Sequence, residues 1–276
     1  DHRDLHSCPP RRSSDLCCSH KDASADRMID LYGAMSKALV ATGRPVVYHP
    51  CHCGWARIWE WAGAIGANHW RIGQDISDDF NYPGNREGYY FDVLDMLDRG
   101  IGLAAHARPG QWNDFDMLVV GLDGRSKELV GAGASNVEYR AHFTLWAMLA
   151  SPLLTGTDVR GLDETTLATL TNPAVIAVNQ DTLGIQAAKV RDDGDVEFFV
   201  KPLADGGQAV AILNRGGAVA TVTADLGALL PPGRRPTRVR DLWRQRDLGT
   251  DAGRLTLEVI PHEALLLKLD TVEAAR

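Results

Sequence analysis

Cysteine is scarce in this sequence, and its placement argues against a disulfide-rich fold. Five cysteines occur among 276 residues, all of them in the first fifth of the chain. An odd number of cysteines without a C-x-x-C pair is a poor disulfide framework. A zinc site is a second interpretation, whose ligands would be Cys17, Cys18, His20, Cys51, His52 and Cys53. Because zinc ligand pairs usually have about two to four residues between them, we expect unpaired thiols or a single bridge, and no metal site.

Long hydrophobic runs and basic stretches are also missing. No apolar run approaches the roughly 20 residues that span a bilayer, so no membrane association is expected. The formal net charge is −7, and without a basic patch a nucleic-acid partner is not expected. The first residues lack the apolar run of a signal peptide. The compartment is therefore left open between secreted and cytoplasmic.

Helical and strand patterns alternate over residues 26–187. Apolar residues recur at helical spacing over 28–39, and a short apolar run follows at 46–48; this predicts a helix and then a buried strand. Ser135-x-x-Glu138 is a capping box that opens a later helix. The remaining expected elements are strands ending at Arg71 and spanning 102–105 and 152–155, and helices at 87–98, 139–149 and 164–170. Such alternation predicts a parallel sheet covered by helices.

Short alternating strands replace this pattern near residue 188. The expected strands are 196–200, 208–213, 220–226, 237–242, 255–260 and 264–269. Turn residues separate these segments, which predicts a small antiparallel β-sandwich. We therefore divide the chain into an irregular segment at 1–25, an α/β domain at 26–187 and a β-sandwich domain at 188–276.

Two motifs combine carboxylates, an arginine and tryptophans. Residues 112–118, W-N-D-F-D-M-L, hold two carboxylates in an aromatic and apolar frame. Residues 69–76, H-W-R-I-G-Q-D-I, place an arginine and a further carboxylate beside a tryptophan. Carboxyl groups can transfer protons, and an aromatic face suits the C–H surface of a sugar. These residue types therefore indicate a carbohydrate site.

The two motifs occur in order with three others, E-Y-R-A-H-F at 138–143, S-P-L-L at 151–154 and V-I-A-V-N-Q-D at 175–181. Together they resemble glycoside hydrolase family 27, the α-galactosidase family. The resemblance implies a (β/α)₈ TIM barrel followed by a β-sandwich. A full barrel has eight strands in about 250 residues, whereas four strands are expected here before the sandwich. We therefore predict a partial barrel of about strands five to eight.

The resemblance assigns roles to three residues of the first motif. Asp75 is similar to the general acid/base, which protonates the leaving oxygen and later takes a proton from water. Arg71 is similar to a residue that binds a sugar hydroxyl, and Trp70 is expected at the same substrate site. The structural alternatives are a turn cap for Asp75 and an ion pair for Arg71.

The second motif resembles the loop after barrel strand seven. There the family's second aspartate, Asp116 in this chain, contacts the sugar most closely, and Asp114 and Met117 line the same pocket. The structural alternative is that Asp114 caps the loop while Met117 packs below it.

The nucleophile and the sugar-selecting residues are assigned from weaker matches. Asp15-Leu16-Cys17 keeps the family's Asp-x-Cys pattern, which makes Asp15 the candidate nucleophile. Ser13 and Ser14 stand where the family has Lys and Tyr. Cys51 and His52 lie where many relatives have the Cys-Glu of Cys-Glu-Trp-Gly, which helps to choose the sugar.

The function implied is a retaining glycoside hydrolase that cleaves terminal α-D-galactosyl residues by a two-carboxylate double displacement. That mechanism needs no metal or organic cofactor, and its partner is a galactoside-type carbohydrate. β-L-arabinopyranosidase and α-N-acetylgalactosaminidase activities remain alternatives within the family. A catalytically inactive, carbohydrate-binding fragment is an alternative of another class. Because half a barrel exposes a sheet edge, pairing with a complementary half or a homo-oligomer is also left open.

Overall fold

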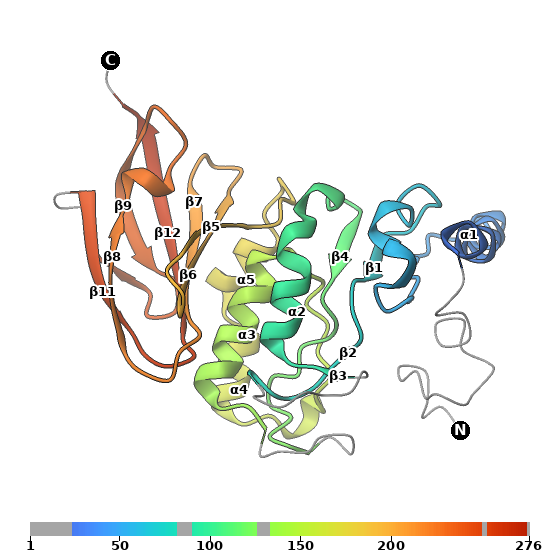
Figure 1. Cartoon of the computed structure of the whole chain (residues 1–276), viewed down its shortest axis with the longest axis horizontal. Coiled ribbons are helices and arrows are strands. Elements are labelled where there is room, and N and C mark those ends of the chain that lie inside the picture. The colour runs from blue at the N-terminus through green and yellow to red at the C-terminus, as the bar shows by residue number, and fades with distance from the viewer. Residues whose placement is uncertain (1–23, 82–89, 126–132, 250–252, 275–276) are drawn as a thin grey trace.

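The computed structural model describes residues 24–81, 90–125, 133–249 and 253–274 (Figure 1). The helices are α1 (Ala25–Ala41), α2 (Val93–Gly100), α3 (Asn136–Met148), α4 (Glu164–Leu170) and α5 (Pro173–Asn179), with 3₁₀ turns at Trp55–Glu60, Ile101–His106, Val159–Gly161 and Gly227–Leu229. The first strands are β1 (His69–Arg71), β2 (Asp75–Ile76), β3 (Tyr90–Phe91) and β4 (Trp112–Asp114). None of the helices among the described residues is long and apolar enough to cross a bilayer.

The short strands of the first part pair in parallel, as the alternating pattern predicted. β1 lies beside β4 with Arg71 opposite Asp114, and β2 lies beside β3. A parallel bridge joins Leu118 to Thr155, at the end of the expected strand 152–155. Since parallel strands run in the same direction, the carboxyl ends of β1 and β4 meet at one edge, where Arg71 and Asp114 lie.

Two of the predicted strands are wrong, and of the strand predicted at 152–155 only the single bridge at Thr155 is present. Residues 46–48 form no strand, and Val46 and Val47 are 44% and 72% exposed. The amide of Tyr48 donates to the Asn68 side chain, not to a neighbouring strand's backbone, so this segment is not part of a hydrogen-bonded ladder. Residues 102–105 form part of a 3₁₀ turn that follows α2 directly. A short apolar run does not by itself distinguish a strand from a helical turn.

Side-chain caps determine where two of the helices begin. The capping box of Ser135 and Glu138 is present at the start of α3, as predicted. Helix α2 begins at Val93, later than the expected 87–98, because Asp92 and Asp95 form a capping box there. This Asp-x-x-Asp pair departs from the usual Ser/Thr-x-x-Glu pattern, so the start of this helix was harder to predict.

The C-terminal region is the predicted antiparallel β-sandwich. Its strands are β5 (Ala188–Asp192), β6 (Val196–Pro202), β7 (Gln208–Asn214), β8 (Ala220–Asp225), β9 (Arg234–Asp241), β10 (Arg246–Asp247), β11 (Arg254–Val259) and β12 (Ala264–Glu273). A six-stranded sheet in the order β10-β9-β12-β7-β6-β5 faces a two-stranded sheet of β11 and β8. All six expected strands are found, while β5 and β10 were not predicted.

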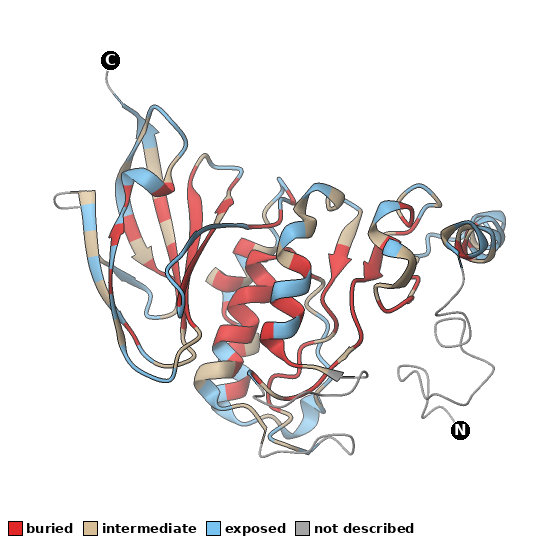
Figure 2. Cartoon of the chain, viewed as in Figure 1, coloured by how far each residue is buried: buried red, intermediate tan, exposed pale blue. Residues whose placement is uncertain are grey.

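Helix α3 joins the two regions of the molecule. It is buried on nearly all sides (Figure 2) and packs against α4, α5 and strands β6, β7 and β12 of the six-stranded sheet. Successive residues of β7 point to opposite faces of the sheet. Val210 and Ile212 face the interior of the sandwich, whereas Ala209 and Ala211 belong to the core that includes α3.

Lys201 of β6 is fully buried where the sandwich meets α3. Its Nζ donates to the carbonyl oxygen of Ala147, near the C-terminal end of α3, at 3.1 Å. A cation is favoured at the negative end of a helix dipole. Burial nevertheless lowers the pKa of Lys201 from 10.5 to about 8. Near neutral pH the folded protein therefore holds a charged group in a site that disfavours the charge.

We predict that Lys201→Met stabilises the protein at pH 7. Removing the desolvated charge contributes about 3 kcal/mol, and losing the hydrogen bond costs about 1, which leaves a gain of about 2 kcal/mol. Between pH 8 and 10.5 the unfolded parent binds more protons than the folded parent, so its stability rises with pH. Urea unfolding across this range should show that rise in the parent and a weaker one in Lys201→Met. A variant less stable at pH 7 would contradict the prediction.

Candidate active site

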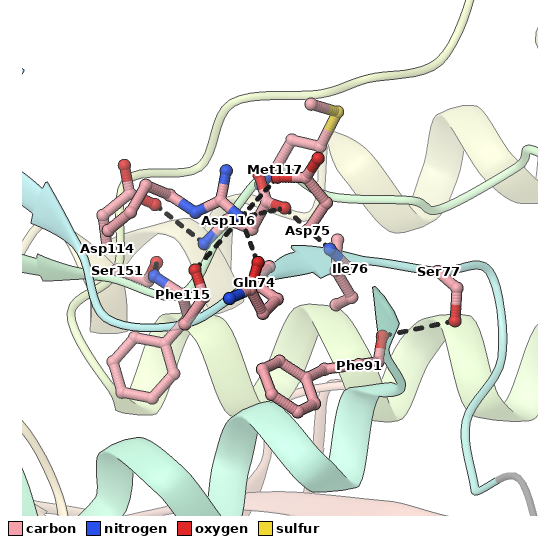
Figure 3. Close-up of polar contacts among 12 residues, drawn as sticks. Gln74, Asp75, Ile76, Ser77, Phe91, Asp114, Phe115, Asp116, Met117 and Ser151 are labelled. Atoms are coloured by element: carbon pink, nitrogen blue, oxygen red, sulfur yellow. Dashed lines mark hydrogen bonds and ion pairs between the residues drawn. The ribbon is translucent and has the colours of Figure 1, made fainter. Parts of the chain in front are cut away.

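The candidate site lies at the carboxyl ends of β1 and β4. Alternate residues of a strand share one face, and the register places His69 and Arg71 of β1 beside Trp112 and Asp114 of β4. The segments that follow these strands carry Asp75, the first residue of β2, and Asp116, so two segments about 40 residues apart in sequence meet here (Figure 3).

Arg71 connects the carboxylates of the two motifs. Its Nη2 lies 2.7 Å from Asp116 Oδ2 and 3.0 Å from Asp75 Oδ1. The same nitrogen donates to the carbonyl oxygen of Gln74 at 2.7 Å. Both Arg71 and Asp116 are buried, whereas the Asp75 side chain is 20% exposed. The ion-pair alternative for Arg71 is therefore present in the structure, and Asp75 is the more accessible of its two carboxylate partners.

Asp116 is held in a constrained position. Its φ of 75° lies in the left-handed region, which a residue other than glycine adopts at a cost. Its Oδ1 accepts from the Met117 amide at 2.7 Å, and its Oδ2 accepts from the Ile76 amide at 2.8 Å. Burial raises the pKa of Asp116 to about 7, because the attraction of Arg71 does not offset desolvation and repulsion by Asp75. Asp116 can therefore exchange a proton near neutral pH.

Asp114 orients Asp116 and contacts two histidines. Its Oδ1 accepts from the Asp116 amide at 2.8 Å, so the turn-capping alternative for Asp114 is also seen. Its Oδ2 lies 2.8 Å from His69 Nδ1 and 3.3 Å from His49 Nε2. Burial alone would raise the pKa of Asp114, but the His69 hydrogen bond and the charges of His49 and Arg71 hold it below its usual value. Burial lowers the pKa of His49, against the attraction of Asp114.

Trp70 does not take the substrate-facing position expected for it. It lies on the opposite face of β1 from Arg71 and is fully buried, with its Nε1 donating to Asn113 Oδ1 at 3.0 Å. Asn113 in turn donates to the Leu103 carbonyl oxygen and to Gln186 Oε1. The ring is therefore part of the core and offers no face to a sugar.

The residues assigned to sugar selection are also largely enclosed. His52 is fully buried between the rings of Tyr32 and Trp55, so direct contact with a sugar is not available to it. Cys51 is half-buried, and its carbonyl oxygen accepts from the Tyr32 hydroxyl at 2.7 Å. Met117 is half-buried beside the core.

Part of the predicted site falls outside the described residues. Asp15, the candidate nucleophile, lies there, as do Cys8, Cys17, Cys18 and His20.

Sequence reasoning missed two residues that contact the site. Trp146 of α3 donates from Nε1 to the carbonyl oxygen of Asp116 at 2.8 Å, and His49 approaches Asp114. Trp146 lies one helical turn after His142, and the two rings are 4.1 Å apart, so helical spacing from the 138–143 motif offered a signal. Burial lowers the pKa of His142 to about 3, which keeps it neutral, as expected for a packing residue.

A cavity lies at the other end of the strands. It has a volume of about 500 Å³, and His69 and Trp112, the first residues of β1 and β4, line it together with Val47 and Leu154. Val47 and Leu154 are 72% and 58% exposed. Neither Asp75 nor Asp116 lines this cavity, so it is separate from the carboxylates that Arg71 binds.

Two family models match consecutive parts of the chain. The model described as "Alpha galactosidase A" matches residues 15–181. The model described as "Alpha galactosidase C-terminal beta sandwich domain" matches residues 193–269.

Individual relatives agree with these matches. Alpha-galactosidase A from Cellvibrio japonicus is 44% identical over 185 residues, which cover 67% of this chain and 43% of the relative. The alpha-galactosidase of Cyamopsis tetragonoloba is 38% identical over 231 residues, covering 84% of this chain and 51% of the relative. The chain therefore spans about half the length of the curated relatives it matches.

Solved structures give the same picture. Alpha-galactosidase I from Mortierella vinacea superposes with a TM-score of 0.83 at 35% identity, covering 91% of this chain and 65% of that protein. A β-L-arabinopyranosidase of family GH27 from Geobacillus stearothermophilus superposes with a TM-score of 0.73 at 29% identity, covering 87% of this chain and 53% of that protein. These similarities support a TIM-barrel-plus-β-sandwich fold.

Proposed function

The chain belongs to the α-galactosidase family, glycoside hydrolase family 27, and on this premise we propose that it carries the acid/base carboxyl of a retaining α-galactosidase. In this proposal residues 26–187 supply about strands five to eight of the barrel, and residues 188–276 form the accompanying sandwich domain. Asp75 protonates the leaving oxygen of a terminal α-galactoside and later takes a proton from the attacking water.

The arrangement of Arg71 between Asp75 and Asp116 is the observation that carries the proposal. An arginine held by two carboxylates can present its remaining N–H groups to a sugar hydroxyl. Its contact with Asp75 also fixes the orientation of that carboxyl, and proton transfer requires such positioning. Asp75 is the more exposed of the two carboxylates, which suits the group that must reach the glycosidic oxygen. Asp15 is the proposed nucleophile.

A β-L-arabinopyranosidase is the second candidate, because the Geobacillus stearothermophilus enzyme of that activity superposes on most of this chain. The two sugars differ mainly at C6, and His52 is buried where many relatives have a residue that selects the sugar. Comparing an aryl α-galactoside with the matching aryl β-L-arabinopyranoside distinguishes the candidates. The ratio of the two kcat/KM values should favour the galactoside.

We predict that residues 1–276 alone show no measurable turnover, whereas a chimaera with a relative's preceding barrel segment is active. The chimaera joins the part of Cellvibrio japonicus alpha-galactosidase A that precedes the position equivalent to Ser24 with residues 24–276 of this chain. The relative then supplies its own early strands and nucleophile, and this chain supplies Asp75, Arg71 and Asp116. Hydrolysis of an aryl α-galactoside is the assay.

The bacterial segment alone and the 276-residue chain alone serve as controls. Turnover by the pure, monomeric chain would refute the proposal that residues 1–276 hold only part of the active site. A chimaera that folds cooperatively and is monodisperse, yet hydrolyses neither aryl glycoside, would favour an inactive carbohydrate-binding fragment.

A further inference from the structure

Two histidines and an aspartate form a compact group on the strand face that carries Arg71. His49 Nε2 and His69 Nδ1 approach the same carboxylate oxygen, Asp114 Oδ2, at 3.3 and 2.8 Å. Their imidazole rings are stacked, with centroids 4.1 Å apart. One ligand atom from each of the three residues lies within 4.8 Å of the other two. The proposed hydrolysis uses neither histidine.

We propose that His49, His69 and Asp114 bind one divalent transition-metal ion of the zinc class. Two imidazole nitrogens and one carboxylate oxygen are a ligand set that zinc adopts with a fourth position left open. Imidazole favours zinc, nickel and copper over the hard ions magnesium and calcium, so the ligand set also selects the class of ion.

The spacing is close to what such an ion requires. With metal–ligand distances of about 2.0–2.1 Å, tetrahedral ligand atoms lie about 3.3–3.4 Å apart. The 3.3 Å between His49 Nε2 and Asp114 Oδ2 already has this value. The 2.8 Å between His69 Nδ1 and Asp114 Oδ2 must widen by about half an ångström. The stacked rings must also turn so that their lone pairs converge.

The surroundings allow the histidine to move and hold the carboxylate in place. The His49 side chain is 33% exposed and lies in a segment without helix or strand, so its ring can rotate at little cost. The other oxygen of Asp114 accepts from the Asp116 amide. Hydrogen bonds of this kind orient metal-ligating carboxylates and raise affinity.

The 500 Å³ cavity provides access to the group. His69 lines this cavity, which gives an ion a route to the ligands and gives water space at the open coordination position. A bound ion would lie near the Arg71 cluster without displacing the contact between Asp114 Oδ1 and the Asp116 amide.

Zinc titration of the metal-stripped 276-residue chain tests this proposal. Isothermal calorimetry with zinc chloride should give one site per chain, and His49→Ala should weaken binding at least about tenfold. His106→Ala, which changes a histidine of the Ile101–His106 turn that is not part of the group, is the matched control and should bind as the parent does. Thermal unfolding checks that each variant is folded, and His49→Gln serves if His49→Ala is not.

Cobalt(II) identifies the ligands by absorption. The parent should show the visible bands of cobalt with nitrogen and oxygen ligands, and no near-ultraviolet charge-transfer band from thiolate. Absence of zinc binding to the folded parent, unchanged binding in His49→Ala and His49→Gln, or a thiolate band that marks Cys51 or Cys53 as the ligand would each overturn the proposal. These experiments measure metal binding. Their outcome therefore does not depend on whether the hydrolysis assay supports the proposed function.

Discussion

Asp75→Asn in the chimaera lowers kcat/KM for an alkyl α-galactoside by roughly 10²–10⁴-fold, the usual contribution of a positioned general acid or base. An alkoxide is a poor leaving group, so its departure depends on protonation by Asp75. A dinitrophenolate leaves without that help. The first step with a dinitrophenyl α-galactoside should therefore be little affected, and the glycosyl-enzyme should accumulate because the variant cannot activate water.

Pre-steady-state kinetics measure this difference directly. The variant should release a burst of dinitrophenolate followed by slow turnover, while kcat and KM for this substrate fall together. Asp123→Asn is the control, because Asp123 is an exposed carboxylate that pairs with Arg125 away from the Arg71 cluster. An equal loss for both leaving groups, with no burst, would indicate that Asp75 only maintains the structure around Arg71.

Arg71→Met destabilises the folded protein by about 3–5 kcal/mol, the cost of leaving a buried partner charge uncompensated. Asp116 is buried and keeps only its amide donors, Ile76 and Met117, when the guanidinium is gone. Losing the cation raises the pKa of Asp116 further above its already raised value. Below about pH 7 this carboxyl is therefore protonated in both proteins, and the difference in stability between variant and parent should shrink as the pH falls from 8 to 5.

Urea unfolding at pH 8 and pH 5 measures that dependence. Arg160→Met removes the arginine of an exposed pair with Asp158 and should leave stability unchanged, since exposed ion pairs contribute little. Adding Asp116→Leu to Arg71→Met should restore part of the lost stability, because the more deeply buried of the two carboxylates that lose Arg71 is then absent. Equal, small effects of Arg71→Met and Arg160→Met would contradict the assignment of Arg71 as the group that neutralises the site.

The fold could be predicted best where the sequence pattern is local. The sandwich strands follow from alternation between polar and apolar residues, and α3 follows from the Ser135 and Glu138 capping box. The strands predicted at 46–48 and 102–105 were wrong, because a strand forms only where hydrogen-bonding partners from elsewhere in the chain lie beside it. The amide of Tyr48 bonds to a side chain, which no local pattern reveals.

The same distinction applies to the site. The meeting of Arg71, Asp75 and Asp116 could be anticipated, because both motifs follow parallel strands that end at one edge. The burial of Trp70 could have been inferred from its parity, since it alternates with Arg71 along β1. Helical spacing from His142 pointed to the position of Trp146 but not to its bond with Asp116. The approach of His49 to Asp114 could not be anticipated, because it depends on how distant segments pack.

Azide rescue of an Asp75→Gly chimaera tests the central claim most directly. Azide attacks a glycosyl-enzyme without needing a general base, so removal of the acid/base leaves this step open. If Asp75 is the acid/base of a retaining enzyme, azide should accelerate turnover of dinitrophenyl α-galactoside and yield α-galactosyl azide. Formation of β-galactosyl azide would instead mark Asp75 as the nucleophile, and turnover that azide does not change would remove it from the reaction.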